Sequence, residues 1–321
     1  MDNLLLILQK TLIYAIPLLI VALGGCFAER SGIINLALEG EMIFGAFIGA
    51  LCVRMFQGAD GYLLAHPQLM FLVALLISGI SGAIFSLLLS FASVKLKADQ
   101  TIAGTALNLL APAIFVTICL AFFNQEKLVM LDIPKYAIKN SELPFILAIF
   151  FDKAYLSTFV CIALFVVLSI WLYKSKVGMH LRACGEHPQA ANSVGINVFK
   201  MRYLGTTISG FLAGVGGYAF MAASAAGTAE SSVGGMGFLA LAIMIFGNWN
   251  PVGIALGALL FGFLKCVGPL SGQIDFFKNL GLPIYFYNII PYLIVIIVLI
   301  ISRKKSGCPK AEGQPYDKGQ R

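Results

Sequence analysis

Residues 69–94 read LMFLVALLISGISGAIFSLLLSFASV and contain no charged side chain. A helix of about 20 apolar residues crosses the ~30 Å hydrocarbon core of a bilayer, so this stretch predicts a transmembrane helix. Eight further apolar segments flank it, at residues 4–28, 41–56, 101–123, 153–173, 202–223, 236–249, 250–268 and 283–302. The sequence therefore predicts an all-α fold, a polytopic membrane helical bundle of about 8–10 transmembrane helices.

The composition excludes a soluble protein. Of the 321 residues, 59% are hydrophobic and only 12% are charged, whereas soluble domains carry about 25% charged residues. So few charges could not cover a soluble surface, and so much apolar material excludes a disordered chain. The seven cysteines show no CxxC spacing and most lie in apolar segments, so we expect them to pack in the core.

Two of the nine segments are short for a complete span. Residues 41–56 follow a polar, glycine-containing stretch, and residues 236–249 run into the sequence Asn-Trp-Asn-Pro. Short segments interrupted by glycine or proline are typical of broken or re-entrant helices beside a transport path. Three GxxxG pairs predict close helix packing: Gly45 with Gly49, Gly210 with Gly214, and Gly253 with Gly257.

Basic residues gather in the loops on one side of the predicted bundle, which is the cytoplasmic side in multi-pass proteins. We therefore predict a cytoplasmic C-terminus, and nine spans then place the N-terminus outside. A lipoprotein signal ending at Cys26 is the alternative for residues 4–28, but no basic residue precedes its apolar core and Lys10 interrupts it. The basic side holds 14 of the 22 basic residues: Arg30, Lys95, Lys97, Lys174, Lys176, Arg182, Lys200, Arg202, Arg303, Lys304, Lys305, Lys310, Lys318 and Arg321.

The chain lacks the common motifs of catalysis and nucleotide binding. It contains no GxxxxGK(S/T) phosphate loop, no HExxH zinc motif and no GxSxG nucleophile motif, and its three histidines have no metal-like spacing. We therefore expect a protein that is not an enzyme and that holds no metal or other cofactor itself.

Three polar stretches interrupt the apolar pattern. The first, ERSGIINLALEGEM at residues 29–42, places ionisable groups between two apolar segments, where charges usually face a cavity or a partner. The second, RACGEHPQAANSVGI at residues 182–196, predicts a short helix over 189–194 with Pro188 in its first turn and a stop at Gly195. The third, GFLALAIMIFGNWNP at residues 237–251, joins a half-length apolar helix to a polar break. A solvated turn is the alternative for the first stretch, and a surface helix without a partner for the second.

These stretches resemble the permease subunits of ABC importers, in the family that includes ribose-type sugar, branched-chain amino acid and nucleoside permeases. Residues 29–42 resemble its E-R-x-G-x-x-N-x-x-x-E-G-x-M segment, residues 182–196 its cytoplasmic coupling loop, and residues 237–251 its G-F-x-A-L-A segment ending in G-x-W-N-P. The chain looks most like the shorter permease of nucleoside importers of the basic-membrane-protein type. Ala37 departs from the glycine that is more frequent in that subfamily.

The resemblance implies a multi-pass subunit of the bacterial cytoplasmic membrane, with a permease domain over residues 1–303, a cytoplasmic coupling loop over about 174–202 and a polar cytoplasmic tail over 304–321. It implies a second homologous permease, an ATP-binding subunit with two nucleotide-binding domains and ATP–Mg, an extracytoplasmic substrate-binding lipoprotein, membrane lipid and a small-molecule solute, without nucleic acid. Closure of the ATPases would switch the paired permeases between outward- and inward-facing states by pushing on the coupling loop. Its candidate coupling residues are Arg182, Gly185, Glu186, Pro188, Ala190, Ala191 and Gly195.

Polar side chains near the helix breaks and inside one span are candidates for the translocation path. A nucleoside needs an aromatic or apolar slot with amides or hydroxyls and little fixed charge. A bond to a neighbouring helix is the structural alternative for Asn108, and an anchor at the membrane interface for Trp249. The alternative functions are the same machine importing sugar, riboflavin or branched-chain amino acids, and an ion-coupled secondary transporter that uses Lys10, Glu39 or Glu41. The candidate path residues are Asn35, Glu39, Asn108, Asn248, Trp249 and Asn250.

Overall fold

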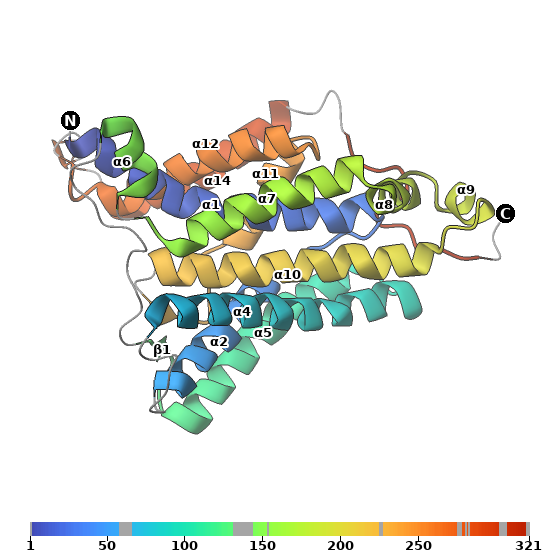
Figure 1. Cartoon of the computed structure of the whole chain (residues 1–321), viewed down its shortest axis with the longest axis horizontal. Helices are drawn as coiled ribbons and strands as arrows, with labels where there is room; N and C mark the ends of the chain where they lie inside the picture. Colours follow the sequence, from blue (N-terminus) through green and yellow to red (C-terminus); the bar gives the residue numbers. More distant parts are fainter. Residues whose placement is uncertain are drawn as a thin grey trace.

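The computed structural model describes residues 2–57, 66–130, 144–152, 154–224, 227–274, 278–279, 281, 283–301 and 307–318. These residues form a bundle of helices, most of which run along the long axis of the molecule (Figure 1). A small antiparallel ribbon pairs β1 (Leu128–Val129) with β2 (Thr228–Ala229). Helices α6 (Phe145–Phe151) and α9 (Pro188–Ser193) lie at opposite ends of the bundle, which we call the α6 end and the α9 end.

All nine apolar segments of the sequence are confirmed as helices. Lys153, the first residue of the segment 153–173, lies outside the described residues. Helix α8 (Lys176–Glu186) joins α7 to α9, and α4 continues into a π-helical turn at Phe91–Lys95. The nine helices are α1 (Asp2–Arg30), α2 (Leu38–Gln57), α4 (Pro67–Ser90), α5 (Gln100–Phe123), α7 (Leu156–Lys174), α10 (Val198–Ser224), α11 (Met236–Phe246), α12 (Pro251–Leu270) and α14 (Ile284–Ile301).

Among the described residues, six helices are long and apolar enough to cross a membrane, namely α1, α4 with its π-helical turn, α5, α7, α10 and α12. Helix α2, which covers residues 41–56, is not among these six, although it is longer than the segment that the sequence predicted. Helix α2 begins at Leu38 and has 20 residues, because Glu39 and Glu41 are part of its first turn. Helix α11 is short, as predicted, with 11 residues. Six candidate spans among the described residues are fewer than the 8–10 that the sequence predicted, and α2, α11 and α14 are the remaining apolar helices of the nine.

Helix α10 lies at the centre of the bundle, where small residues let it approach its neighbours (Figure 1). A Cβ atom on Gly214 would lie 2.2 Å from the carbonyl oxygen of Ser78 in α4, and one on Gly45 in α2 would lie 2.4 Å from the Cα of Gly214. The hydroxyl of Ser78 donates to the carbonyl of Gly214 at 2.6 Å. The predicted close packing of these glycines is therefore confirmed: any larger residue would push the three helices apart.

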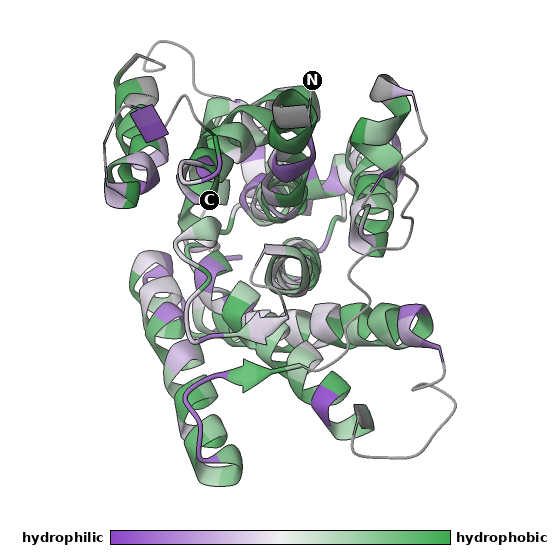
Figure 2. Ribbon diagram, turned by 90° about the vertical axis from the view of Figure 1, so that its left-hand side faces the viewer, coloured by the Kyte–Doolittle hydropathy of each residue, from purple (hydrophilic) through white to green (hydrophobic). Residues whose placement is uncertain are grey.

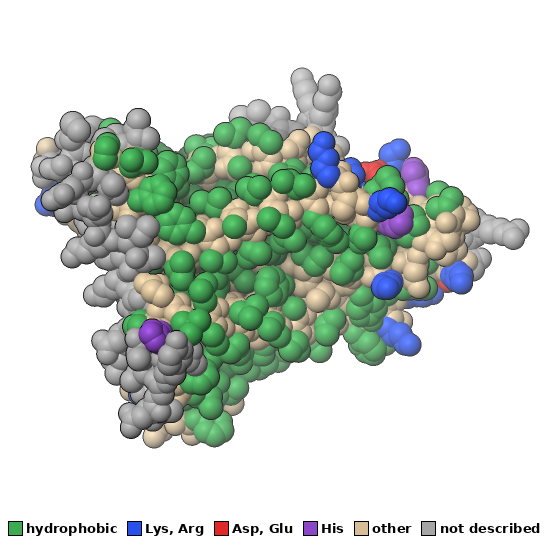
Figure 3. Space-filling model, viewed as in Figure 1, with side chains coloured by type: hydrophobic (Ala, Val, Ile, Leu, Met, Phe, Trp, Pro, Cys, Tyr) green, Lys and Arg blue, Asp and Glu red, His purple; other side chains and the backbone are tan. Residues whose placement is uncertain are grey.

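Large apolar side chains cover the outside of the bundle. They extend over its middle in Figure 3, and the ribbon in Figure 2, viewed along the long axis and coloured by hydropathy, is mainly hydrophobic in many of the helices. Leu109 and Phe122 of α5, for example, are 77% and 79% exposed. A surface of this kind fits hydrocarbon rather than water, so the chain is a multi-pass membrane protein.

Basic side chains gather at the α9 end (Figure 3). The basic residues that the structure describes at this end lie in loops or near helix ends, which is where the predicted positively charged loops place them. Arg303, Lys304, Lys305 and Arg321 of the predicted basic tail lie outside the described residues. The described members of this group include Lys95, Lys97, Lys174, Lys176, Arg182 and Lys200.

Candidate functional site

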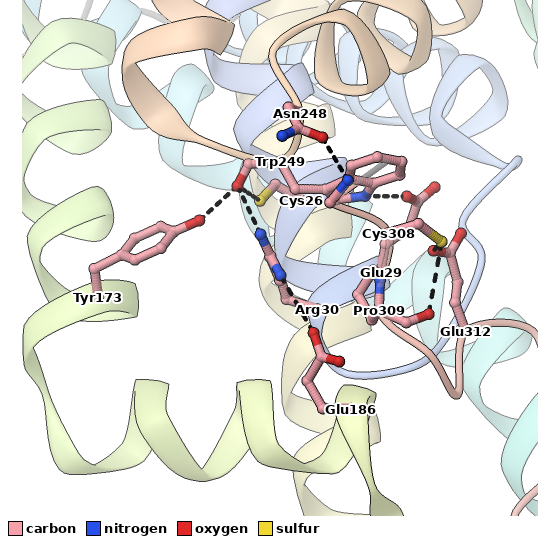
Figure 4. Close-up of polar contacts among 11 residues, drawn as sticks. Cys26, Glu29, Arg30, Tyr173, Glu186, Asn248, Trp249, Cys308, Pro309 and Glu312 are labelled. Carbon is pink, nitrogen blue, oxygen red and sulfur yellow. Dashed lines mark hydrogen bonds and ion pairs between the residues drawn. The ribbon is translucent and has the colours of Figure 1, made fainter. Parts of the chain in front are cut away.

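The three polar stretches of the sequence meet at the α9 end (Figure 4). The first begins in the last turn of α1, the second covers the end of α8 and all of α9, and the third ends in the turn between α11 and α12. Arg30 of α1 joins them. Its Nη1 lies 3.7 Å from Oε1 of Glu186 in α8, and its Nη2 donates to the carbonyl of Trp249 at 3.4 Å. One arginine therefore ties together the ends of α1 and α8 and the α11–α12 turn.

Trp249 is the second junction of this cluster. Asn248 and Trp249 have φ values of 53° and 54°, in the left-handed region that non-glycine residues rarely adopt. The indole Nε1 donates to the Glu29 carboxylate at 2.5 Å, and the Trp249 carbonyl accepts a hydrogen bond from the hydroxyl of Tyr173 in α7. Trp249 and Glu29 are both buried. The indole is thus used to join the α11–α12 turn to α1.

Asn250 completes this turn. Its Oδ1 accepts a hydrogen bond from the backbone N–H of Val252 at 3.0 Å, so Asn250 caps α12, whose first residue is Pro251. A side-chain acceptor followed by proline is a frequent helix start. The asparagine and proline of the Asn-Trp-Asn-Pro sequence therefore have a local structural role.

The predicted short helix in residues 182–196 is confirmed as α9. Pro188 is its first residue, one position earlier than predicted, and Gly195 follows its end with φ of 87°. The backbone N–H of Gly195 donates to the carbonyl of Asn192 at 3.0 Å. The left-handed glycine ends the helix, as such residues commonly do.

The small residues of the coupling loop face inward. A Cβ atom on Gly185 would lie 2.4 Å from the carbonyl oxygen of Arg30. Ala191 is buried against Cys184, Val198 and Tyr316. Packing within this chain therefore explains their small size.

Other residues of the loop face outward. Ala190 and Gly195 are exposed, and the space around Gly195 is open within 4 Å of a Cβ position. Arg182 is half-buried, with its guanidinium 4.9 Å above the ring of Tyr173 and one Nη donating to the Tyr173 carbonyl at 3.3 Å. Exposed side chains on and just beyond α9 form what we call the α9 face, made of Gln189, Ala190, Ser193 and Val194.

The break between α1 and α2 is stabilised by buried hydrogen bonds. The amide of Asn35 donates to both carboxylate oxygens of Glu41 at 3.1 and 3.0 Å and to the hydroxyl of Ser209 in α10 at 2.9 Å. Its Oδ1 accepts from the backbone N–H of Ala37 at 3.0 Å. All three polar side chains are fully buried. Asn35 thus fastens the break to the central helix.

Glu39 and Asn108 hold the first turn of α2 from two sides. The carboxylate of Glu39 accepts from the backbone N–H groups of Gly235 and Gly237 at 2.9 and 2.7 Å, at the N-terminus of α11, where negative charge is favoured. The amide of Asn108 donates to the Leu36 carbonyl and accepts from the Gly40 N–H, both at 2.7 Å. Asn108 therefore hydrogen-bonds a neighbouring helix, which was the alternative to its predicted place on the translocation path.

Residues 307–318 pack against the α9 end. The backbone N–H of Ala311 donates to the Gly185 carbonyl at 2.9 Å, and the buried Arg202 donates through Nη1 to the Gln314 carbonyl at 2.9 Å. Lys97 and Asp317 form an ion pair at 2.8 Å, and the ring of Tyr316 lies 5.2 Å from that of Phe199. We call residues 307–318 the clasp, because they touch α8, α10 and the α4–α5 loop together.

This packing was not predicted from the sequence, in which residues 304–321 were expected only to form a polar cytoplasmic tail. The signal that could have found it is the presence of Pro309 and Tyr316 in an otherwise polar segment. Asn248, a predicted path residue, also belongs to this contact, since its Oδ1 accepts from the backbone N–H of Gly307. Within the described residues, no group of three or more His, Cys, Asp or Glu side chains could hold a metal ion.

Comparisons with known proteins find relatives that cover nearly the whole chain. Residues 7–299 match the family described as the permease component of the branched-chain amino acid transport system. The guanosine ABC transporter permease protein NupQ of Bacillus subtilis is 37% identical over 98% of both chains. The nucleoside ABC transporter permease protein NupC of Lactococcus lactis is 38% identical over 99% of both chains. The guanosine ABC transporter permease protein NupP of Bacillus subtilis is 26% identical over 89% of this chain and 78% of its own. No solved structure matches.

Proposed function

The chain belongs to the family of branched-chain amino acid transport system permease components, and on this premise we propose that it is a permease subunit of an ABC importer that carries nucleosides. The names of the relatives NupQ and NupC support the solute class. The chain supplies a membrane path and a transmission element, while ATP–Mg is bound and hydrolysed on a separate subunit.

The observation that carries the proposal is the junction at Arg30. The α9 face is exposed, and α8 behind it is packed on the Arg30 backbone through Gly185 and paired with its side chain through Glu186. Arg30 in turn contacts the α11–α12 turn at Trp249. If an ATPase displaces α9, these close-packed contacts therefore transmit the displacement to two membrane helices.

This function implies an orientation and partners. The basic α9 end faces the cytoplasm and the ATPase, which puts the C-terminal clasp inside, and the α6 end faces an extracytoplasmic binding lipoprotein. NupQ and NupP are both named guanosine transporter permeases of one organism, which supports a second, homologous permease beside this chain.

The contacts of the intramembrane acids favour an importer over an ion-coupled transporter. Glu39 caps α11 and Glu41 accepts both of its hydrogen bonds from Asn35. Carboxylates engaged in this way fix the helix breaks, whereas a coupling site needs ligands that an ion can reach. We propose that Asn35, Glu39, Asn108, Asn248, Trp249 and Asn250 shape the path by holding its walls.

Reconstitution tests the function. The chain is assembled in proteoliposomes with its ATPase, the second permease and the binding protein, and uptake of radiolabelled guanosine, adenosine, ribose and leucine is measured with ATP inside. We expect ATP-dependent uptake of the nucleosides alone, with faster ATP hydrolysis when the loaded binding protein is present. Uptake of leucine or ribose in preference to nucleosides, or uptake driven by an ion gradient without ATP, contradicts the proposal.

A further inference from the structure

A cavity of about 330 Å³ lies beside the β1–β2 ribbon, at the end of the bundle that also holds α6 (Figure 1), between α2, α10 and the segment that links β2 to α11. Its inner wall is apolar, with Ala46 of α2, Met221 of α10 and Val233 all buried. Its size lies at the lower end of the range of small-molecule sites, about 300–1,000 Å³. The space therefore suits one small solute rather than a peptide or a lipid.

The wall and the rim of the cavity differ in chemistry. Phe220 of α10 presents a half-buried aromatic ring, which lies 6.3 Å from the ring of Tyr14 in α1. Thr228, Glu230 and Ser232 bring two hydroxyls and a carboxylate to the outer side, where Glu230 and Ser232 are exposed. An apolar, partly aromatic slot with a polar edge matches a molecule that has one flat ring and several hydroxyls.

The rim is held in place from three directions. The Gly234 carbonyl accepts hydrogen bonds from Nζ of Lys265 at 3.0 Å and from the hydroxyl of Tyr292 at 2.7 Å. Glu230 pairs with Lys127 at 2.7 Å. On the inner side the next residue, Gly235, donates to Glu39. The cavity is thus preformed, and its lining segment leads directly to the helix break at Glu39.

We propose that this cavity is the outer receiving site for the solute, and that it holds one nucleoside with its base against Phe220 and its ribose hydroxyls at Thr228, Glu230 and Ser232. The inference rests on the proposed function, and it adds the place where the solute is held before the helix break. The carboxylate of Glu230 accepts hydrogen bonds from ribose hydroxyls, while the neutral inner wall excludes charged solutes such as nucleotides.

Uptake kinetics of the complete, reconstituted importer test the site. Phe220→Ala removes the stacking surface, so we expect the KM for nucleoside uptake to rise about fivefold or more, as loss of a base–aromatic stack does elsewhere. Phe220→Tyr keeps the ring and should raise the KM less than Phe220→Ala does. Phe263→Ala is the matched control, because Phe263 is exposed on α12 and does not line the cavity.

Direct occupancy is measured with Ser232→Cys and a membrane-impermeant maleimide added from outside. Because Ser232 is exposed on the rim, its replacement should fold, and the extra labelling over wild type should be slowed by the nucleoside-loaded binding protein but not by the empty one. Wild-type uptake of nucleosides, together with an unchanged KM for Phe220→Ala and unprotected labelling at position 232, overturns the site and leaves the proposed function intact. Absence of nucleoside uptake by the wild-type importer overturns both.

Discussion

Asn108 of α5 accepts a hydrogen bond from the backbone N–H of Gly40 in α2 at 2.7 Å, where the two helices approach each other closely. A Cβ atom on residue 40 would lie 2.7 Å from the carbonyl oxygen of Leu107. An amide left unpaired in the membrane interior is costly. The first turn of α2 therefore depends on α5 for its position, and the carboxylates of Glu39 and Glu41 depend on that turn.

Asn108→Leu keeps the size of the side chain but removes both of its hydrogen bonds. We expect the free energy of unfolding to fall by about 1–3 kcal/mol, because the Gly40 N–H and the Leu36 carbonyl lose their partner. Thermal unfolding in detergent measures this, and uptake should fall together with stability. Thr105→Val, at an exposed position of the same helix, is the control. A stable Asn108→Leu protein that has lost uptake would instead place the amide in contact with the solute.

Trp249 and Glu29 should behave as an energetic pair. Trp249→Phe removes the indole N–H and leaves the buried Glu29 carboxylate without that donor, which should cost about 1–3 kcal/mol. Glu29→Gln should lower the free energy of unfolding less in the Trp249→Phe background than in the wild type. The double mutant should therefore lose less stability than the sum of the two single mutants. Trp171→Phe, at the other tryptophan, controls for the loss of ring size. Strict additivity in the thermal unfolding cycle would contradict the pairing.

The helices were predictable because hydrophobic length alone specifies them in a membrane. Nine apolar segments became nine helices, and the glycine pairs did mark close approaches such as Gly45 with Gly214. The start of α2 was misjudged because Glu39 and Glu41 look like loop residues, yet α11 and Asn35 satisfy their carboxylates from elsewhere in the chain. Partners that are distant in sequence cannot be recognised from local composition.

The candidate site was predictable as three stretches but not as one cluster. The sequence selected Glu29, Glu186 and Trp249 for separate reasons, and only the fold reveals that Arg30 lies between them. The inward packing of Gly185 was hidden for the same reason, since a small residue can serve either a partner or its own chain. The clasp was missed because several of its contacts, such as those of Ala311 and Gln314, are made by backbone groups, which local sequence does not distinguish.

Substitutions at positions 190 and 185 should distinguish an effect on ATPase docking from an effect on folding. Ala190→Trp adds bulk on the exposed α9 face, so we expect wild-type stability in detergent but weaker co-purification with the ATPase and loss of coupled uptake. Gly185→Ala forces an atom toward the Arg30 carbonyl and should lower stability itself, by about 1–3 kcal/mol. The comparison needs both thermal unfolding and pull-down assays. Normal ATPase binding and uptake in Ala190→Trp would show that the α9 face is not the docking surface.

Glu312 makes the clasp sensitive to pH. It is a half-buried carboxyl, and burial raises its pKa above the ordinary value of about 4.5. Its Oε2 accepts a hydrogen bond from the thiol of Cys308 at 2.6 Å. Burial, with Glu312 beside it, raises the pKa of Cys308 to about 12, so this thiol stays protonated at neutral pH and adds no titration of its own.

The raised pKa of Glu312 determines whether its contribution to stability rises or falls with pH. The folded protein binds the Glu312 proton more tightly than the unfolded chain does, so this group favours folding most at low pH, and its contribution declines as pH rises from about 4.5 through the raised pKa. Glu312→Gln removes this titrating carboxyl and leaves the neighbouring carboxyl of Glu29 in place. We therefore expect the melting temperature of wild type, relative to Glu312→Gln, to fall between pH 4.5 and pH 8, whereas Glu126→Gln, at an exposed position, should run parallel to wild type. A difference between wild type and Glu312→Gln that stays constant over this range would mean that the clasp accommodates the charged carboxylate at no cost.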